Sequence, residues 1–325
     1  MELLAKLAQA YGASGNESVV RDIIISEIKK YCDDYEVDAM GNLIAHKKGN
    51  GVKVMFAAHM DEIGIIVTHI DKNGYLRFSK VGGLYIRDLV HRRVRFSNGV
   101  VGVIGSEEDE FNKKPDITRL YIDIRADTRD EASKSVSIGD TAVFCGETVV
   151  SGNRIISKAL DNRAGCYILI SAMKKIKRNK NDLYFVFTTQ EEVGLRGAKA
   201  AAYSVDPDYA IAIDVTDTGD TPECNVMDVK LGRGAAIKVM DSSIICDVDV
   251  RTVLIETAKK NKIPYQIEIM SDGGTDAGAV HLTRAGIKTG GISLPTRYIH
   301  SPSEMADIKD LEACCELLIK SVDAF

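Results

Sequence analysis

The chain has 325 residues and a formal net charge of −5, and hydrophobic residues make up 45% of it. This length allows one large or two ordinary domains. The negative charge argues against a nucleic-acid-binding protein, which needs a basic face, and no run approaches the roughly 18 apolar residues of a membrane span. The scattered cysteines form no Cys-x-x-Cys pair, and the first residues lack a signal-peptide profile. We therefore expect a cytoplasmic protein with reduced thiols and no nucleic-acid or membrane partner.

The N-terminal stretch predicts two helices and then three strands. A short helix over residues 1–10 precedes a second helix that ends near Tyr31. Ser14 and Glu17 have the spacing of a capping box for the second helix. Two glycines within residues 49–51 predict a hairpin turn between the last two strands. The predicted strands are 35–38, 42–48 and 52–58.

The pattern changes to short strands separated by turns from Ile63 to about Val150. Residues 97–99, Ser-Asn-Gly between two apolar runs, are a strong hairpin signal. A short helix is predicted for 128–136. The predicted strands are 63–70, 75–81, 90–96, 100–104, 120–124 and 141–144. We interpret this stretch as a small β-rich domain inserted into an α/β domain, with residues 66–152 forming the insert and residues 1–65 plus 153–325 the α/β domain.

Strands and helices alternate again after residue 151. The predicted strands are 183–189, 209–214, 235–240, 265–270 and 287–294. The predicted helices are 161–176, 249–260, 275–284 and 308–325, and a further helical stretch begins at the glycines at 194 and 197. Alternation of this kind indicates an α/β fold in which helices cover a mixed, mainly parallel sheet.

The most informative stretch is Glu191-Glu192, which follows the apolar strand predicted at 183–189. Polar residues at the carboxyl end of a strand lie where α/β sheets place their sites. Adjacent carboxylates repel each other, and successive strand side chains point in opposite directions. The pair therefore fits two separate roles, one metal ligand and one general base. Taken alone, the pair is equally well explained as a solvated acidic turn.

Polar residues also mark three other strand ends and one helix start. His59 and Asp61 follow the strand that ends at residue 58, Asp214 closes another, His300 follows the last, and Asp161 begins a helix. Each has an ordinary explanation by itself: a satisfied polar group, a loop residue or, for Asp161, a helix N-cap. Because parallel strands bring their carboxyl ends to one edge of the sheet, their joint placement favours a metal site.

The candidate ligands suit a pair of divalent metals such as Zn²⁺ or Co²⁺. They are His59, Asp161, Glu192, Asp214 and His300. The three carboxylates balance two dications once a hydroxide is added, and two metals can hold a substrate carbonyl and a water-derived nucleophile. Glu191 is then free to move the proton. Asp61 can accept the other N–H of His59.

Five motifs resemble those of the tetrahedral (TET) aminopeptidases, a family of two-metal aminopeptidases also called glutamyl aminopeptidases or, loosely, endoglucanases. They run in the order of the family and span nearly the whole chain. The motifs are residues 57–64, 158–165, 189–194, 273–278 and 297–304. Two departures from the family pattern are Arg125, where we expect a glycine, and residues 242–245, where a proline is missing.

The resemblance implies a zinc-peptidase-like fold whose inserted β-barrel-like segment is a dimerisation domain. It implies that Asp161 bridges two metal ions. His59 and Asp214 would complete one metal site, and Glu192 and His300 the other.

The resemblance also implies the function. Glu191 would be the general base and Asp61 the residue that orients His59. The chain would be a metallo-aminopeptidase that acts on short peptides and self-associates through dimers into a dodecamer. Two alternatives stay open: a deacylase or carboxypeptidase-like hydrolase on the same two-metal scaffold, and an oligomeric scaffold without catalysis.

Overall fold

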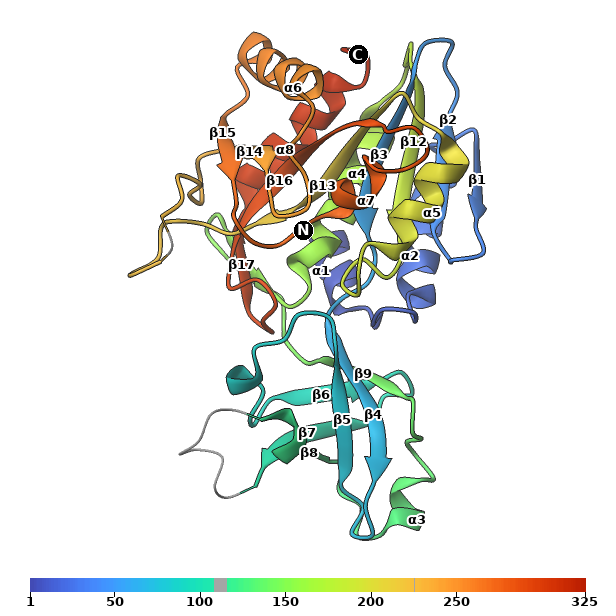
Figure 1. Cartoon of the computed structure of the whole chain (residues 1–325), viewed down its shortest axis with the longest axis vertical. Helices are drawn as coiled ribbons and strands as arrows, with labels where there is room; N and C mark the ends of the chain where they lie inside the picture. The colour runs from blue at the N-terminus through green and yellow to red at the C-terminus, as the bar shows by residue number, and fades with distance from the viewer. Residues whose placement is uncertain (108–115, 225) are drawn as a thin grey trace.

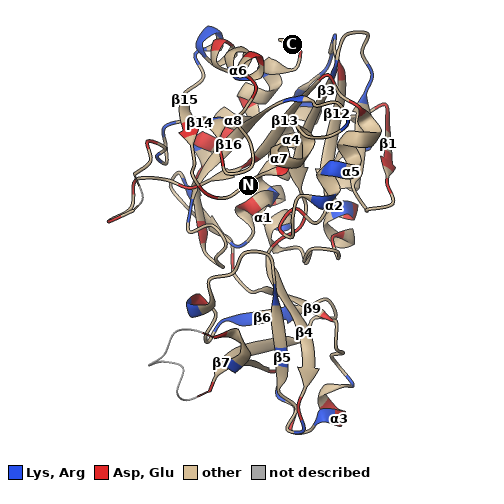
Figure 2. Ribbon diagram, in the orientation of Figure 1, with Lys and Arg blue, Asp and Glu red and all other residues tan. Residues whose placement is uncertain are grey.

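The protein is described here by a computed structural model that covers residues 1–107, 116–224 and 226–325. Figure 1 shows an α/β body above and a smaller β-barrel below, with the chain passing between them. The body holds a mixed sheet flanked by helices, which confirms the predicted fold class. Lys and Arg are spread over both parts and interleaved with Asp and Glu (Figure 2). None of the helices in the described ranges is long and apolar enough to cross a membrane.

The elements have the following bounds. The strands of the large sheet are β1 (Asp34–Val37), β2 (Leu43–Lys47), β3 (Lys53–His59), β10 (Val149–Ser151), β11 (Arg154–Ser157), β12 (Asp182–Thr188), β13 (Tyr209–Thr216), β14 (Ala235–Met240), β15 (Tyr265–Ile269), β16 (Lys288–Arg297) and β17 (Glu304–Asp307). The barrel strands are β4 (Gly64–Ile70), β5 (Leu76–Val81), β6 (Arg93–Phe96), β7 (Val101–Ser106), β8 (Leu120–Asp123) and β9 (Thr141–Phe144). The helices are α1 (Glu2–Gln9), α2 (Ser18–Ile28), α3 (Arg129–Ala132), α4 (Leu160–Lys175), α5 (Arg196–Val205), α6 (Val248–Asn261), α7 (Asp276–Val280) and α8 (Ile308–Ser321).

The centre of the large sheet is parallel. Strands β12, β3, β13 and β16 lie side by side in that order, and each neighbouring pair is parallel. The flanking pairs, such as β1 with β2 and β16 with β17, are antiparallel. Parallel strands are buried on both faces, and the all-apolar run of β12 fits this position. The four central strands therefore end at a common edge.

The hairpin predicted at residues 49–51 is wrong, because β12 inserts between β2 and β3 and pairs with both. The glycines serve a different purpose. A Cβ at Gly49 would lie 2.1 Å from the backbone oxygen of Asn181, so only a glycine lets the loop pass the start of β12. Short local signals could not reveal a strand that arrives 130 residues later in the sequence.

Helices cover both faces of the sheet. Successive residues of β3 point to opposite faces, so Val54 and Phe56 pack in one core cluster and Met55 and Ala57 in another. Helices α1, α2, α4, α6 and α8 pack into the first cluster, and α5 and α7 into the second. Fully burying a side chain such as Phe56 contributes about 1.5–3 kcal/mol. The packing on both faces holds the common strand edge in place.

The inserted stretch forms a closed antiparallel barrel in the order β4-β5-β8-β7-β6-β9, with its own apolar core. The hairpin predicted at residues 97–99 joins β6 to β7, and Gly99 has the positive φ of 88° that such a turn needs. The predicted helix at 128–136 is shorter, since α3 ends at Ala132. Strands β10 and β11, which the sequence did not predict, belong to the large sheet. The division into two domains at 65/66 and 152/153 stays a prediction.

Arg125, which stands where a glycine was expected, has a φ of +67°. This left-handed conformation is costly for a residue with a Cβ. Its backbone N–H donates to Asp123 Oδ1 at 2.7 Å, which helps to hold the turn. The expectation of a glycine thus corresponds to a real feature of the backbone.

Candidate metal centre

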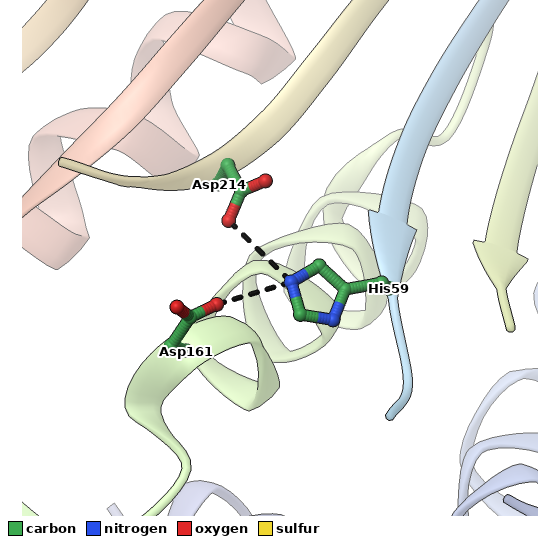
Figure 3. A group of neighbouring side chains, drawn as sticks. All are labelled: His59, Asp161 and Asp214. Atoms are coloured by element: carbon green, nitrogen blue, oxygen red, sulfur yellow. Dashed lines mark hydrogen bonds and ion pairs between the residues drawn. The ribbon is translucent and has the colours of Figure 1, made fainter. Parts of the chain in front are cut away.

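The candidate ligands come from the strand edge described above. His59 is the last residue of β3, Asp214 lies near the end of β13, Glu192 follows β12, and His300 follows β16. Asp161 comes from the first turn of α4. Figure 3 shows Asp161 and Asp214 pointing at the same ring nitrogen of His59 from two different elements. The predicted convergence on one edge is therefore present in the fold.

Two three-residue groups have the geometry of metal sites, and they share one member. In the first, His59 Nε2 lies 3.0 Å from Asp161 Oδ1 and 3.7 Å from Asp214 Oδ1. In the second, His300 Nε2 lies 3.4 Å from Asp161 Oδ2 and 3.2 Å from Glu192 Oε2. Within each group the ligand atoms all lie within 4.8 Å of one another. Asp161 therefore faces the first group with one carboxylate oxygen and the second with the other.

The site is buried and rich in carboxylates, which displaces its pKa values. Burial raises the pKa of Asp214 well above its usual range, and the nearby charge of Asp161 adds to this effect. Burial also raises the pKa of Glu192, again with help from Asp161. Burial alone would lower the pKa of His300, but hydrogen bonds to Asp161 and Glu192 raise it to about 12. The site therefore holds more buried acid than its two histidines can balance, which favours the binding of a cation.

Glu191, the predicted base, lies next to the first group. Its Oε2 is 3.8 Å from His59 Nε2. Burial raises the pKa of Glu191 well above its usual range; the charge of His59 opposes this shift, whereas Asp214 and Glu192 reinforce it. The Glu191 side chain lines the cavity in front of the site. Within the described ranges no side chain donates a hydrogen bond to the Glu191 carboxylate, which leaves it available to a bound molecule.

Asp61 supports both the histidine and the acidic pair. His59 Nδ1 lies 3.1 Å from the backbone oxygen of Asp61 and 3.5 Å from its Oδ1. The same carboxylate accepts the backbone N–H of Glu191 at 3.0 Å and that of Glu192 at 3.2 Å. The sequence predicted only the contact with His59. The second set of bonds fixes the strand end that carries the acidic pair.

Ser14 completes this arrangement, and its predicted role as a capping residue is wrong. Its hydroxyl donates to Asp61 Oδ2 at 2.7 Å. Helix α2 begins at Ser18 with Glu17 in the N-cap position and no side-chain cap bond. Ser14 lies three residues before the N-cap position and so cannot cap this helix. Its hydroxyl instead donates to a charged carboxylate, which makes a short and strong hydrogen bond.

Glu304 is a supporting residue that the sequence reasoning missed. Its carboxylate accepts the backbone N–H of Asp161 and that of His300, each at 3.0 Å. It is 1% exposed. The only signal was its place at the end of the motif at 297–304. Glu304 therefore fixes the backbone of two members of the second group, Asp161 and His300.

Asp161 is not a helix N-cap, which was its ordinary explanation. Ala159 occupies that position with a φ of 52°, and the peptide bond between Asp161 and Asn162 is cis. Asn162 donates to the backbone oxygen of Ile213, next to Asp214. The Asp161 side chain contacts His59 and His300 and makes no cap hydrogen bond to the helix backbone.

A cavity of about 780 Å³ opens in front of the site. Its wall includes the ends of β13, β15 and β16, the loop at 273–275 and two residues that follow β5 of the barrel, Gly83 and Tyr85. A Cβ on Gly83 would lie 2.8 Å from His300 Nδ1, so a glycine is needed for this approach. The volume suits a small ligand or the end of a peptide.

Known proteins resemble the chain over nearly its whole length. A putative aminopeptidase of Acetivibrio thermocellus is 54% identical over 99% of this chain and 98% of its own. The TET aminopeptidase of a marine-sediment Thaumarchaeota archaeon superposes with a TM-score of 0.95 at 37% identity, covering 99% of this chain and 96% of its own. The Pyrococcus horikoshii TET1 peptidase, described as assembling into a tetrahedron or a large octahedral shell, gives 0.90 at 38%, with 99% and 98% covered.

The sequence model of the M42 glutamyl aminopeptidase family matches residues 41–317. This match includes all seven residues predicted for the site, from His59 to His300. The five sequence motifs indicated a resemblance to the TET aminopeptidases, and both the sequence match and the fold confirm it. The chain belongs to the M42 glutamyl aminopeptidase family and is a metal-dependent peptidase.

Proposed function

We propose that the chain is an aminopeptidase that removes N-terminal residues from short peptides with two divalent metal ions, zinc or cobalt, in its buried site. The observation that carries this proposal is the sharing of Asp161 between two ligand groups. His59 and Asp214 would hold one ion with Asp161. Glu192 and His300 would hold the other.

The donor set fits two borderline divalent ions. Imidazole and carboxylate are ligands that zinc and cobalt accept. Burial and the neighbouring charge of Asp161 raise the pKa values of Glu192 and Asp214. The site thus carries more buried acid than its two histidines balance. Glu192 Oε1 is buried without a hydrogen-bond partner in the described part of the chain. Such a group is costly unless something binds it.

The chain's own residues would then handle the protons. When bound, the two ions would polarise the peptide carbonyl and acidify a water molecule. Glu191 would take a proton from that water, because its carboxylate is in the cavity wall and is not engaged by a donor side chain. It would return the proton to the leaving amine, which must be protonated to depart. Asp61 would keep Glu191 in position through its backbone N–H.

A panel of substrates tests this function against its alternatives. Metal-loaded protein should hydrolyse Leu-Ala-Ala but not N-acetyl-Leu-Ala-Ala, since an aminopeptidase needs the free amine. Faster hydrolysis of the acetylated peptide at the acetyl group would favour a deacylase, and release from the carboxyl end a carboxypeptidase. Loss of all turnover in Glu191→Gln, with bound metal retained, would tie the activity to this site.

We also propose that the barrel serves assembly. The TET1 peptidase of Pyrococcus horikoshii is described as assembling into a tetrahedron or a large octahedral shell, and the barrel here contributes none of the seven proposed site residues. Val103 on β7 and Ile138 beyond α3 are apolar and exposed. Charge substitution at these two positions should release subunits while metal binding remains. Light scattering during size-exclusion chromatography measures this, and a metallated, active monomer of the unaltered protein would contradict it.

A further inference from the structure

The cavity wall beyond the candidate ligands is acidic. Among the described residues that line it, three carboxylates lie outside the proposed metal and base set: Asp217, Glu223 and Asp272. None of the three forms an ion pair within the described ranges. Arg297 is the only lysine or arginine among the described residues of the wall. Its guanidinium is already paired with Asp220, at 2.9 Å from Oδ1 and 2.8 Å from Oδ2.

The acidic wall lies close to the metal centre. Asp217 follows β13 directly and lines the cavity. Burial raises the pKa of its carboxyl group, and the positive charge of His300 opposes this shift. Asp272 lies beyond β15, on a segment that contacts the end of β13 through the Thr216 hydroxyl, which donates to Met270 Sδ at 3.4 Å. Two neighbouring segments therefore present carboxylates to the same space.

The wall also offers an unused hydrogen-bonding group. Thr275 lines the cavity and is 3% exposed, and its hydroxyl oxygen has no partner within the described ranges. A buried hydroxyl without a partner costs free energy, so it marks a place where a ligand group can bind. Met270 and Ile269, which also line the cavity, supply apolar contact for an aliphatic chain. A long side chain with a cationic tip matches such a surface.

We propose that this wall selects peptides whose N-terminal residue is lysine or arginine and disfavours an N-terminal glutamate. The preference rests on the proposed aminopeptidase function, because it assigns the wall to the side chain of the residue being removed. An acidic side chain would meet these three carboxylates, and the one arginine among the described wall residues is already paired with Asp220. A basic side chain would meet the same carboxylates with opposite charge.

Equilibrium binding separates the preference from turnover. We would titrate metal-loaded Glu191→Gln by calorimetry with Lys-Ala-Ala, norleucine-Ala-Ala, Gln-Ala-Ala and Glu-Ala-Ala. Norleucine matches lysine in length without the ammonium, and glutamine matches glutamate without the charge. Lys-Ala-Ala should bind roughly tenfold more tightly than norleucine-Ala-Ala, since each partly exposed ion pair adds a modest factor. Glu-Ala-Ala should bind more weakly than Gln-Ala-Ala. Raising the salt should shrink both differences.

Matched variants test the residues themselves. Asp217→Asn with Asp272→Asn should reduce the lysine-to-norleucine ratio to within about threefold, as two charges are removed. Asp228→Asn removes one charge from an exposed position outside the cavity wall and should leave the ratio unchanged.

The outcomes are distinguishable. Equal affinities for all four peptides, or tighter binding of Glu-Ala-Ala, would overturn the preference and leave the aminopeptidase function standing. A loss of affinity for all four peptides in the double variant would assign the carboxylates to the free α-amine and also overturn the preference. Failure of every peptide to bind the metal-loaded protein would refute the proposed function and the preference together.

Discussion

Asp61 is the residue whose replacement tests the proposed organisation of the site most directly. Its carboxylate accepts three hydrogen bonds, from Ser14, Glu191 and Glu192. In Asp61→Asn only one oxygen remains, so at least one of these donors faces an amide NH₂ instead. A hydrogen bond to a charged acceptor is worth about 1.5–3 kcal/mol, and a buried donor left without a partner adds a similar cost. We expect metal-free Asp61→Asn to lose about 2–4 kcal/mol of unfolding free energy.

Metal affinity should fall as well. Residues that orient a ligand from behind typically change metal affinity by about 10–100-fold, and the Asp61 carboxylate lies 3.5 Å from His59 Nδ1 and accepts the backbone N–H of Glu192. Chelator competition measures the affinity, and urea unfolding of the metal-free protein measures the stability. Ser14→Ala is the control, because it deletes one donor to Asp61 and leaves both backbone bonds. It should cost only about 0.5–1.5 kcal/mol and leave metal affinity nearly unchanged. Wild-type metal affinity in Asp61→Asn would refute the reasoning.

Three further predictions concern the metals, the base and one backbone position. Elemental analysis after dialysis should give about two transition metal ions per chain, and full activity with one ion would contradict the shared role of Asp161. Glu191→Gln should keep its metals and lose at least about 10²–10⁴-fold in kcat, because the amide cannot take a proton; near-normal turnover would assign the base elsewhere. Arg125→Gly should raise the unfolding free energy by up to about 1 kcal/mol, since it relieves a left-handed backbone; a lower Tm in calorimetry would show that the Arg125 side chain makes a compensating contact.

The sequence predicted those parts of the site that depend on strand ends. His59, Asp214 and the acidic pair follow apolar runs, and apolar runs that alternate with helices specify a parallel sheet whose ends meet. The supporting residues were not predictable in this way. Ser14 reaches Asp61 across 47 residues, and Glu304 reaches Asp161 across 143. Each looks like an ordinary loop residue until the chain is folded.

The order of strands was the other feature that local patterns could not give. Two glycines around Asn50 look like a hairpin turn, yet β12 separates the strands on either side. Tertiary burial decides the strand order, since residues 183–187 of β12 form a continuous apolar run that gains most from a central position. The short strands β10, β11 and β17 at one end of the large sheet were missed because three or four residues carry little periodicity.

The loop that follows β5 places the barrel in contact with the metal centre. A Cβ on Gly82 would lie 3.2 Å from Glu192 Oε2, and one on Gly83 would lie 2.8 Å from His300 Nδ1. The barrel is therefore not a removable accessory, because excising it would strip the cavity of part of its wall. A hybrid that joins this α/β body to the barrel of a relative should therefore work only if that barrel also has glycines at positions 82 and 83. If another subunit binds the barrel and shifts it, the same loop would move against two candidate ligands, Glu192 and His300.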